Sequence, residues 1–562
     1  MTIQKIQKQM VTDAVLIFRN NQFLGQDILD SENQILKLTG FSGSAGTLVI
    51  TRSHAFLFVD GRYEIQSKQQ TNAAEITVIV ENGEQNLSKW LKENFCKAAI
   101  GYNPWQISEK QLQNFKKLLP DSSFCPNPQI IPTPRATAFE HDTAYTGETA
   151  EKKIAHVAGL IAVSGADAFL FAAADSVSWL TNLRSNALPD TPVVRAMALL
   201  TKEGKLTLFA DNLRLPAGCK FNKLPLSRLK KELKAFTKHK ISLDLKTTPA
   251  AVAEMCRKLK INIADHADNC TFLKSQKNTT ELQGMVNAHI RDGEAICRFL
   301  SWLEKHHTGK NEMDIVRKVL ALRKKQELFY SVSFRTIAGA GANAAIIHYQ
   351  PTDENHALLA ENSVLLLDSG GQYLDGTTDI TRTIAIGTPP EEMKEKFTIV
   401  LKAHIALASL KFPYHTSGTR LDAVCRSVMW RYGLDYKHGT GHGVGHFLNV
   451  HEGPQNMGAS GNTYPLKPGM VLSIEPGYYQ EKAFGIRIEN LYYIAEDDKA
   501  PEFLKFIPLT LAPIDLRMIN EYLLTDGEKE WLNDYHHKVL ETLAPKLSGK
   551  EKDWLEKACA PL

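Results

Sequence analysis

VLLLDSGGQYLDGTTDITRTIAIG, residues 364–387, carries one aspartate at the end of a strand-like segment and another at the start of the next. Asp368 closes a continuous apolar run, as at the end of a buried strand. Asp379 opens an alternating run in which every second side chain lies on the same face. A carboxylate in such a place costs free energy unless a positive charge compensates it. The stretch therefore predicts strands whose acidic side chains meet a cation.

Two later stretches repeat this arrangement. VLSIEPGYY, residues 471–479, ends an apolar run at Glu475. In FGIRIENLYYIA, residues 484–495, Arg487 and Glu489 share one face of the expected strand. One arginine against four acidic side chains leaves a need for more positive charge, which divalent metal supplies. Four carboxylates and one histidine exceed the roughly four ligands of a single zinc, and they fit two cations that share bridging carboxylates.

The histidine of this set is expected in HGTGHGVGHFLNVHEG, residues 438–453. Its glycines let the backbone approach closely, so that several imidazoles can converge on one object. One imidazole would complete the metal site, and the others would stand around the substrate. A zincin helix is excluded, because the glutamate of HExxH is missing and the glycines would make a poor helix.

Length and composition limit the class of protein. The 562 residues are too many for one ordinary core. With 66 basic and 62 acidic side chains, the net charge of +4 argues against nucleic acid as a partner. No apolar run reaches the roughly 18 residues of a membrane span, and the N-terminus lacks a signal-peptide core. The eight cysteines form no CxxC pair, which favours a reduced, cytoplasmic setting.

The first half of the chain contains a weak internal repeat. Strand-like segments recur in the same order: 13–18, 47–51 and 57–62, then 167–171, 197–201 and 208–214. This order predicts two related α/β domains. Proline-rich residues 127–139 and a helix-capping pattern at 279–281 indicate boundaries. We therefore expect α/β domains at 1–140 and 141–274, a catalytic domain at 275–505, and a helical extension at 506–562 packed on it.

The tail has two sequence signatures of a capped helix. The capping boxes TDGE, residues 525–528, and SGKE, residues 548–551, predict two amphipathic terminal helices. The histidine pair 536–537 is expected to be exposed.

The order and spacing of these residues resemble the pita-bread metallopeptidases. Several motifs look like the Xaa-Pro aminopeptidase (aminopeptidase P) family in its long three-domain form. They are IIHYQP (346–351), SIEPGYY (473–479) and FGIRIEN (484–490), with GFSGSAGTLVI (40–50), VDGRYEIQ (59–66) and WLTNLRSN (179–186) nearer the N-terminus. The resemblance implies two creatinase-like α/β domains followed by a pita-bread catalytic domain.

The resemblance also implies a pair of divalent cations in each chain. Mn²⁺ is expected first, with Zn²⁺ or Co²⁺ as alternatives. Asp368 would bind one cation, Asp379 and Glu489 would bridge both, and His442 and Glu475 would bind the second.

The same resemblance implies the reaction. His348, His438 and His451 would line the substrate site, and Glu475 would move protons. Arg487 would lie beside Glu489, either behind the metal ligands or on the substrate side. The chain would release the N-terminal residue from peptides with proline second, by attack of a hydroxide held between the metals. Xaa-Pro dipeptidase (prolidase) and a non-catalytic peptide-binding module stay open as alternatives. A cytoplasmic homodimer is expected, with peptides as partners and neither nucleic acid nor membrane.

Overall fold

The computed structural model describes residues 2–25, 27–459 and 463–562. They form two compact units. The N-terminal unit comprises Met1–Asp142, Glu148–Leu188 and Pro192–Thr271, and the C-terminal unit comprises Thr143–Gly147, Pro189–Thr191 and Phe272–Leu562. The finer division into four segments stays a prediction.

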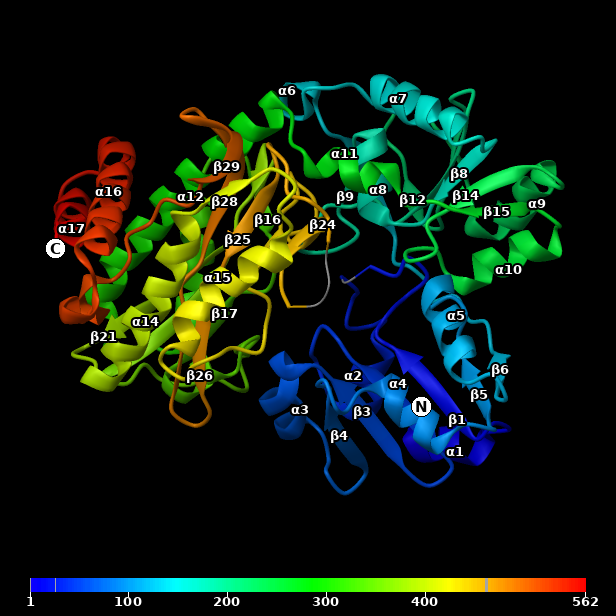
Figure 1. Ribbon diagram of the computed structural model, residues 1–562, viewed down its shortest axis with the longest axis horizontal. Helices are drawn as coiled ribbons and strands as arrows, with labels where there is room; N and C mark the ends of the chain where they lie inside the picture. The colour runs from blue at the N-terminus through cyan, green and yellow to red at the C-terminus, as the bar shows by residue number, and fades with distance from the viewer. Residues whose placement is uncertain (1, 26, 460–462) are drawn as a thin grey trace. The chain divides into compact units, whose positions relative to one another are not determined.

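The N-terminal unit contains two six-stranded sheets. In spatial order, the first consists of β4 (Ile76–Val80), β3 (Ala55–Val59), β2 (Thr47–Thr51), β1 (Ala14–Phe18), β5 (Ala99–Tyr102) and β6 (Ser123–Pro126). The second consists of β13 (Asn222–Leu224), β11 (Leu206–Phe209), β10 (Met197–Thr201), β8 (Ala168–Phe171), β14 (Lys240–Leu243) and β15 (Asn262–Asp265). Both sheets are labelled in part in Figure 1.

The two sheets have the same topology. In the first, β1 pairs antiparallel with β2 and parallel with β5, and β2 pairs antiparallel with β3. In the second, β8 pairs antiparallel with β10 and parallel with β14, and β10 pairs antiparallel with β11. The outer strands β4, β6, β13 and β15 are parallel to their neighbours in both. The weak repeat in the sequence is therefore a repeat of structure, and the expectation of two related α/β domains is confirmed.

The C-terminal unit is built on antiparallel strands with helices packed against them (Figure 1). One sheet joins β17 (Ile337–Ala340), β18 (Ser363–Ser369) and β21 (Ile380–Ile386). A larger one joins β22 (Lys411–Pro413), β29 (Ala500–Pro508), β28 (Asn490–Asp497), β25 (Val471–Ile474), β23 (Gly441–Gly443) and β24 (Glu452–Met457). β26 (Gly477–Gln480) and β27 (Phe484–Arg487) form a hairpin. The main helices are α12 (Thr279–His306), α13 (Glu312–Arg323), α14 (Glu391–Ala408) and α15 (Gly418–Trp430).

The two terminal helices fit the sequence expectations only in part. α16 (Asp526–Leu543) begins with the predicted capping box between Thr525 and Glu528. α17 (Lys550–Ala558) begins without one: Gly549 is its N-cap, and the Glu551 carboxylate accepts a hydrogen bond from Arg298 instead. The prediction of a second capping box was therefore wrong.

The histidine pair in α16 is also not placed as expected. His536 is 0% exposed, and its Nε2 accepts a hydrogen bond from the Ile514 backbone N–H at 3.0 Å. It lies on the same helical face as buried Leu532 and Val539, while His537 is exposed. The expectation of an exposed pair was wrong for His536.

Arg382 joins the terminal helices to the central strands. Its side chain is buried in β21 and donates hydrogen bonds to both backbone and side-chain oxygens. The acceptors include the Glu489 carbonyl at 2.8 Å, the Ala512 carbonyl at 2.8 Å and the Tyr535 hydroxyl of α16 at 3.0 Å. One guanidinium thus binds β21, the chain beside β28 and the C-terminal tail together.

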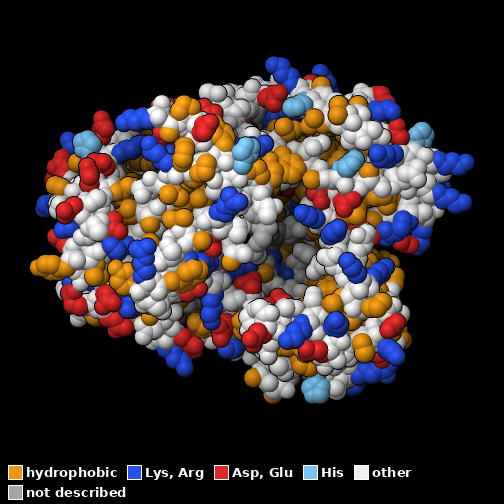
Figure 2. Space-filling model, viewed as in Figure 1, with side chains coloured by type: hydrophobic (Ala, Val, Ile, Leu, Met, Phe, Trp, Pro, Cys, Tyr) orange, Lys and Arg blue, Asp and Glu red, His pale blue; other side chains and the backbone are white. Residues whose placement is uncertain are grey.

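The surface carries charges of both signs. Figure 2 shows Lys and Arg side chains interspersed with Asp and Glu over the face that it draws, in keeping with the net charge of +4. Among the described residues, no helix has both the length and the apolar composition that crossing a membrane requires.

Candidate active site

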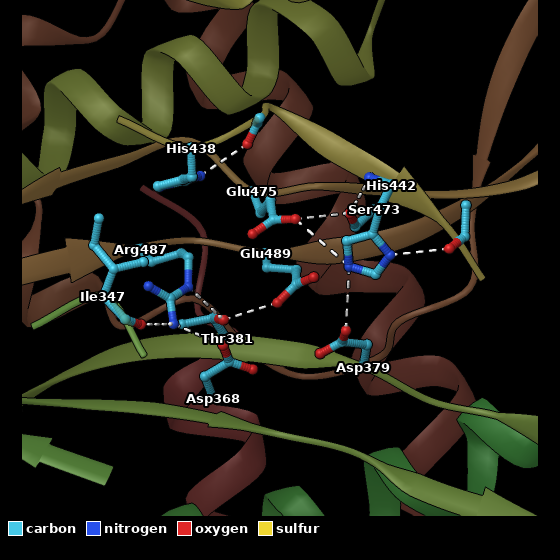
Figure 3. Close-up of polar contacts among 12 residues, drawn as sticks. Ile347, Asp368, Asp379, Thr381, His438, His442, Ser473, Glu475, Arg487 and Glu489 are labelled. Carbon is cyan, nitrogen blue, oxygen red and sulfur yellow. Dashed lines mark hydrogen bonds and ion pairs between the residues drawn. The ribbon is translucent and has the colours of Figure 1, made fainter. Parts of the chain in front are cut away.

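Five predicted side chains project from separate segments of the C-terminal unit (Figure 3). Asp368 lies in β18, Asp379 immediately precedes β21, and His442 lies in β23. Glu475 follows β25, and Glu489 lies between β27 and β28. The antiparallel pairing of β18 with β21 sets Asp368 opposite Thr381, two residues beyond Asp379, so both aspartates lie at one end of this sheet.

His442 lies at the centre of the acidic group. Its Nε2 is 3.5 Å from Asp379 Oδ2 and 3.6 Å from Glu475 Oε1. One ligand atom each from Asp379, His442 and Glu489 lies within 4.8 Å of the others. His442 Nδ1 donates to the Gly443 carbonyl at 2.9 Å, so in the neutral imidazole the lone pair is on Nε2, the atom beside Asp379 and Glu475. This is the tautomer that binds a metal through Nε2.

The four carboxylates of this group carry more negative charge than the cationic side chains and hydrogen-bond donors around them can balance. Within the described residues, Asp368 Oδ1, Asp379 Oδ1 and Glu489 Oε1 are buried and have no hydrogen-bond partner. Burial, followed by repulsion from neighbouring carboxylates, raises the pKa of Asp379 and of Glu489 well above the usual range. Burial also raises the pKa of Glu475. Buried, mutually repelling oxygen donors with one imidazole fit divalent cations, which would remove this penalty.

Arg487 holds two of the carboxylates in place. It is 1% exposed, and its Nη2 donates to Asp368 Oδ2 at 2.6 Å. Its Nε donates to Thr381 Oγ1 at 3.1 Å, and that hydroxyl donates to Glu489 Oε2 at 2.8 Å. Arg487 therefore orients Asp368 directly and Glu489 through Thr381 (Figure 3).

The other predicted histidines lie around this group at different depths. The His451 ring packs edge-on against His442, with centroids 4.3 Å apart. His438 is buried, and its Nδ1 donates to the Gly439 carbonyl at 2.8 Å. His348 follows Ile347, whose carbonyl accepts from Arg487 Nη2 at 3.3 Å. Their roles toward a substrate stay predictions.

Tyr479 belongs to this group, although the sequence analysis did not select it. Its hydroxyl accepts from Arg487 Nη1 at 2.8 Å and donates to His438 Nε2 at 2.8 Å. Burial raises the pKa of Tyr479 to about 12, so the hydroxyl keeps its proton at neutral pH. In the hairpin, Tyr479 pairs with Gly485, two residues from Arg487, so that both side chains share a face. The alternation of side chains along the strands of this hairpin was the signal that could have identified Tyr479 from the sequence.

Ser473 was likewise missed. Its hydroxyl accepts from the His442 backbone N–H at 2.9 Å and donates to Glu475 Oε1 at 3.0 Å. It therefore fixes the distance between the histidine strand and the glutamate.

Family models match the chain in four consecutive segments. The model for metallopeptidase family M24 matches residues 283–496, and the model for its C-terminal region matches 502–562. Two models for a creatinase/prolidase N-terminal domain match residues 2–137 and 127–281. The matches confirm the expected fold class, with creatinase-like N-terminal domains before a pita-bread catalytic domain.

Similar proteins extend this match over the full length. A probable Xaa-Pro aminopeptidase P of Laccaria bicolor is 35% identical over 100% of this chain and 92% of its own length. Aminopeptidase P2 of Arabidopsis thaliana is 34% identical over 98% of this chain and 86% of its own. The crystal structure of an X-prolyl aminopeptidase from Caenorhabditis elegans, described as a cytosolic enzyme with a di-nuclear active site, superposes with a TM-score of 0.93. It shares 32% identity and covers 98% of this chain and 95% of its own.

Proposed function

The chain belongs to metallopeptidase family M24, among its full-length Xaa-Pro aminopeptidases, and we propose that it releases the N-terminal residue from peptides with proline in the second position. The observation that carries the proposal is the group of buried carboxylates around His442, with carboxylate oxygens that lack hydrogen-bond partners. A prolidase from Thermococcus sibiricus aligns with only 66% of this chain at a TM-score of 0.54, which favours the aminopeptidase over the dipeptidase.

The donor set supports two divalent cations. Asp368 would hold one, His442 and Glu475 would hold the other, and Asp379 and Glu489 would bridge both. The carboxylate-rich donors favour Mn²⁺ over Zn²⁺ or Co²⁺. When bound, such a pair supplies Lewis acidity, which brings the pKa of a water toward neutral and polarises the scissile carbonyl.

Glu475 is the group that would move protons. Glu475 Oε1 lies 3.6 Å from His442 Nε2, within the group that would hold the cations, and a carboxylate in that place can accept a proton and return it. It would accept a proton from the attacking water and deliver it to the proline nitrogen as the peptide bond breaks. Ser473 holds Glu475 Oε1 in place for both steps.

The imidazoles would act on the carbonyl side of the bond. A peptide bond before proline has no N–H, so the protein cannot bind this bond through its nitrogen. His451, which packs on His442, is the first choice to donate to the developing oxyanion. His438, held by Tyr479, and His348 would complete the substrate site.

The test compares peptides that differ only in length. Purified protein loaded with Mn²⁺ should hydrolyse Xaa-Pro-Yaa tripeptides with a higher kcat/KM than the matching Xaa-Pro dipeptides. A strong preference for dipeptides would instead identify a prolidase. Absence of cleavage in protein with a full metal complement would support a non-catalytic peptide-binding module.

The proposal also includes a cytoplasmic homodimer. Trp430, the last residue of α15, and Tyr432 just beyond it are 54% and 40% exposed, and we assign this aromatic pair to the interface because aromatic side chains are enriched there. The cytosolic description of the Caenorhabditis elegans enzyme supports the location. In light scattering, the wild type should have the mass of two chains and Trp430→Glu the mass of one.

A further inference from the structure

Glu312 is a buried carboxylate outside the proposed metal site. It occupies the first turn of α13 and is 0% exposed. Its Oε1 accepts from the Ala340 backbone N–H at 2.7 Å and from Asn343 Nδ2 at 2.9 Å. Its Oε2 accepts from the Ala357 backbone N–H at 2.7 Å and from the Tyr349 hydroxyl at 2.9 Å. These four hydrogen bonds compensate the burial of the charge.

The four donors lie on both sides of His348 in the chain. They therefore fix the two ends of segment 340–357, which carries His348 near its middle. The Glu312 backbone N–H also donates to the Ala357 carbonyl at 3.0 Å, which adds a backbone link to the same end. The Glu312 side chain, at the start of α13, thus holds both ends of this segment in place.

The middle of segment 340–357 packs against the hairpin strand β27. A Cβ added to Gly485 would lie 1.9 Å from the Ala344 carbonyl oxygen, so the two backbones are in close contact. Arg487 Nη2 donates to the Ile347 carbonyl and also to Asp368. The segment is therefore held by Glu312 at its ends and by Arg487 beside His348.

We propose that Glu312 is a positioning residue that sets the place of the His348 imidazole at the active site. This inference rests on the proposed function, in which His348 lines the substrate site. Glu312 acts through the segment, because its donors are at 340, 343, 349 and 357, on either side of the histidine.

A carboxylate is required here because both of its oxygens accept hydrogen bonds. Glutamine at 312 would keep one acceptor oxygen and would turn an N–H₂ group toward two donors. The Tyr349 hydroxyl could rotate to accept, but a backbone N–H such as that of Ala357 could not. Glu312→Gln therefore releases one end of the segment while it preserves the size of the side chain.

The experiment is a double-mutant cycle between Glu312→Gln and His348→Ala. kcat and KM are measured with an Xaa-Pro-Yaa tripeptide, Mn²⁺ in excess, and a temperature below the melting transition of every variant. Misplacement of one group by about 1 Å costs up to about 100-fold, so we expect Glu312→Gln to lower kcat/KM by about 10- to 100-fold. The change should fall on the same parameter, kcat or KM, as in His348→Ala.

The double variant separates positioning from general stability. If Glu312 acts through His348, the double variant has the kcat/KM of His348→Ala alone. Glu281→Gln is the matched control, since Glu281 is a buried carboxylate that caps α12 and makes its capping bond with Asn278. Its effect on kcat/KM, if any, should multiply with that of His348→Ala. Tyr349→Phe removes one of the four donors and should give a smaller loss that also disappears in the His348→Ala background.

Two outcomes would overturn the inference while the proposed function stands. One is a Glu312→Gln enzyme with wild-type kcat and KM, and the other is a double variant whose loss equals the product of the two single losses. If Glu312→Gln does not fold, the same comparison is made with Tyr349→Phe. If His348→Ala had wild-type kcat and KM, His348 would have no role in the reaction, and the inference about Glu312 would be refuted as well. A wild-type enzyme that does not cleave the tripeptide would refute the proposed function itself.

Discussion

Removal of the Tyr479 hydroxyl would measure how much this group contributes to holding Arg487 and His438 in place. Tyr479→Phe removes one oxygen and keeps the ring. It removes the hydroxyl that lies 2.8 Å from Arg487 Nη1 and 2.8 Å from His438 Nε2. A hydrogen bond to a charged group contributes about 1.5–3 kcal/mol and one between neutral groups about 1 kcal/mol. The combined loss is therefore about 2.5–4 kcal/mol.

This free energy should appear in two measurements. Arg487 also orients Asp368 and, through Thr381, Glu489, so part of the loss should fall on catalysis. We expect kcat/KM for a tripeptide to fall by about 10- to 100-fold, which corresponds to about 1.4–2.7 kcal/mol. Independently of this, the loss of the two hydrogen bonds should lower the free energy of unfolding in urea by about 2.5–4 kcal/mol, measured on metal-free protein.

Tyr478→Phe is the matched control. The Tyr478 hydroxyl donates to Gln480 Oε1 at a distance of 3.4 Å in the same hairpin and does not touch Arg487 or His438 in the described structure. Its removal should change kcat/KM and the free energy of unfolding only slightly. If Tyr479→Phe behaved like Tyr478→Phe, the hydroxyl would not hold Arg487 and His438, and the reasoning would be refuted.

Three further predictions follow from other parts of the chain. His442→Ala should retain less than about a tenth of the activity, with an unchanged far-ultraviolet circular dichroism spectrum, because an essential ligand is lost. Gly441→Ala should lower both kcat/KM and calorimetric Mn²⁺ affinity, since the new Cβ would lie 1.9 Å from the Ser473 carbonyl oxygen and force β23 away from β25. Burial raises the pKa of Asp268 from 3.8 to about 6, so the folded chain binds this proton more tightly than the unfolded chain does. The wild-type free energy of unfolding should therefore fall, relative to that of Asp268→Asn, by about 3 kcal/mol as the pH rises through this interval. Urea titrations at several pH values would measure this difference, and parallel curves for the two proteins would contradict it.

The acidic group could be predicted from the sequence because its members interrupt apolar runs. Asp368 and Glu475 each follow such a run, and β18 and β25 end within one residue of them. The repeat of the N-terminal unit was visible for a similar reason, since strand-like segments recur in a fixed order. Local patterns of this kind reveal which residues are buried and on which face.

Contacts between distant segments could not be predicted in this way. The bond from Thr381 to Glu489 and the bond from Tyr479 to His438 depend on how strands far apart in the chain pair with one another. Glu312 reads as an ordinary exposed acid at a helix start, because nothing near it reveals its four donors. His536 differs, since the helical period of Leu532 and Val539 already placed it on the buried face.

Arg382 makes the activity depend on the segment that follows β29. The carbonyl of Ala512 and the hydroxyl of Tyr535 are synthesised after the strands that carry the site, and both accept from this guanidinium. Until they arrive, Arg382 is buried without its full set of acceptors, and the strand that follows Asp379 is not secured. A polypeptide that stops before Ala512 should therefore be inert, so that peptide cleavage begins only once this segment has been made and has folded.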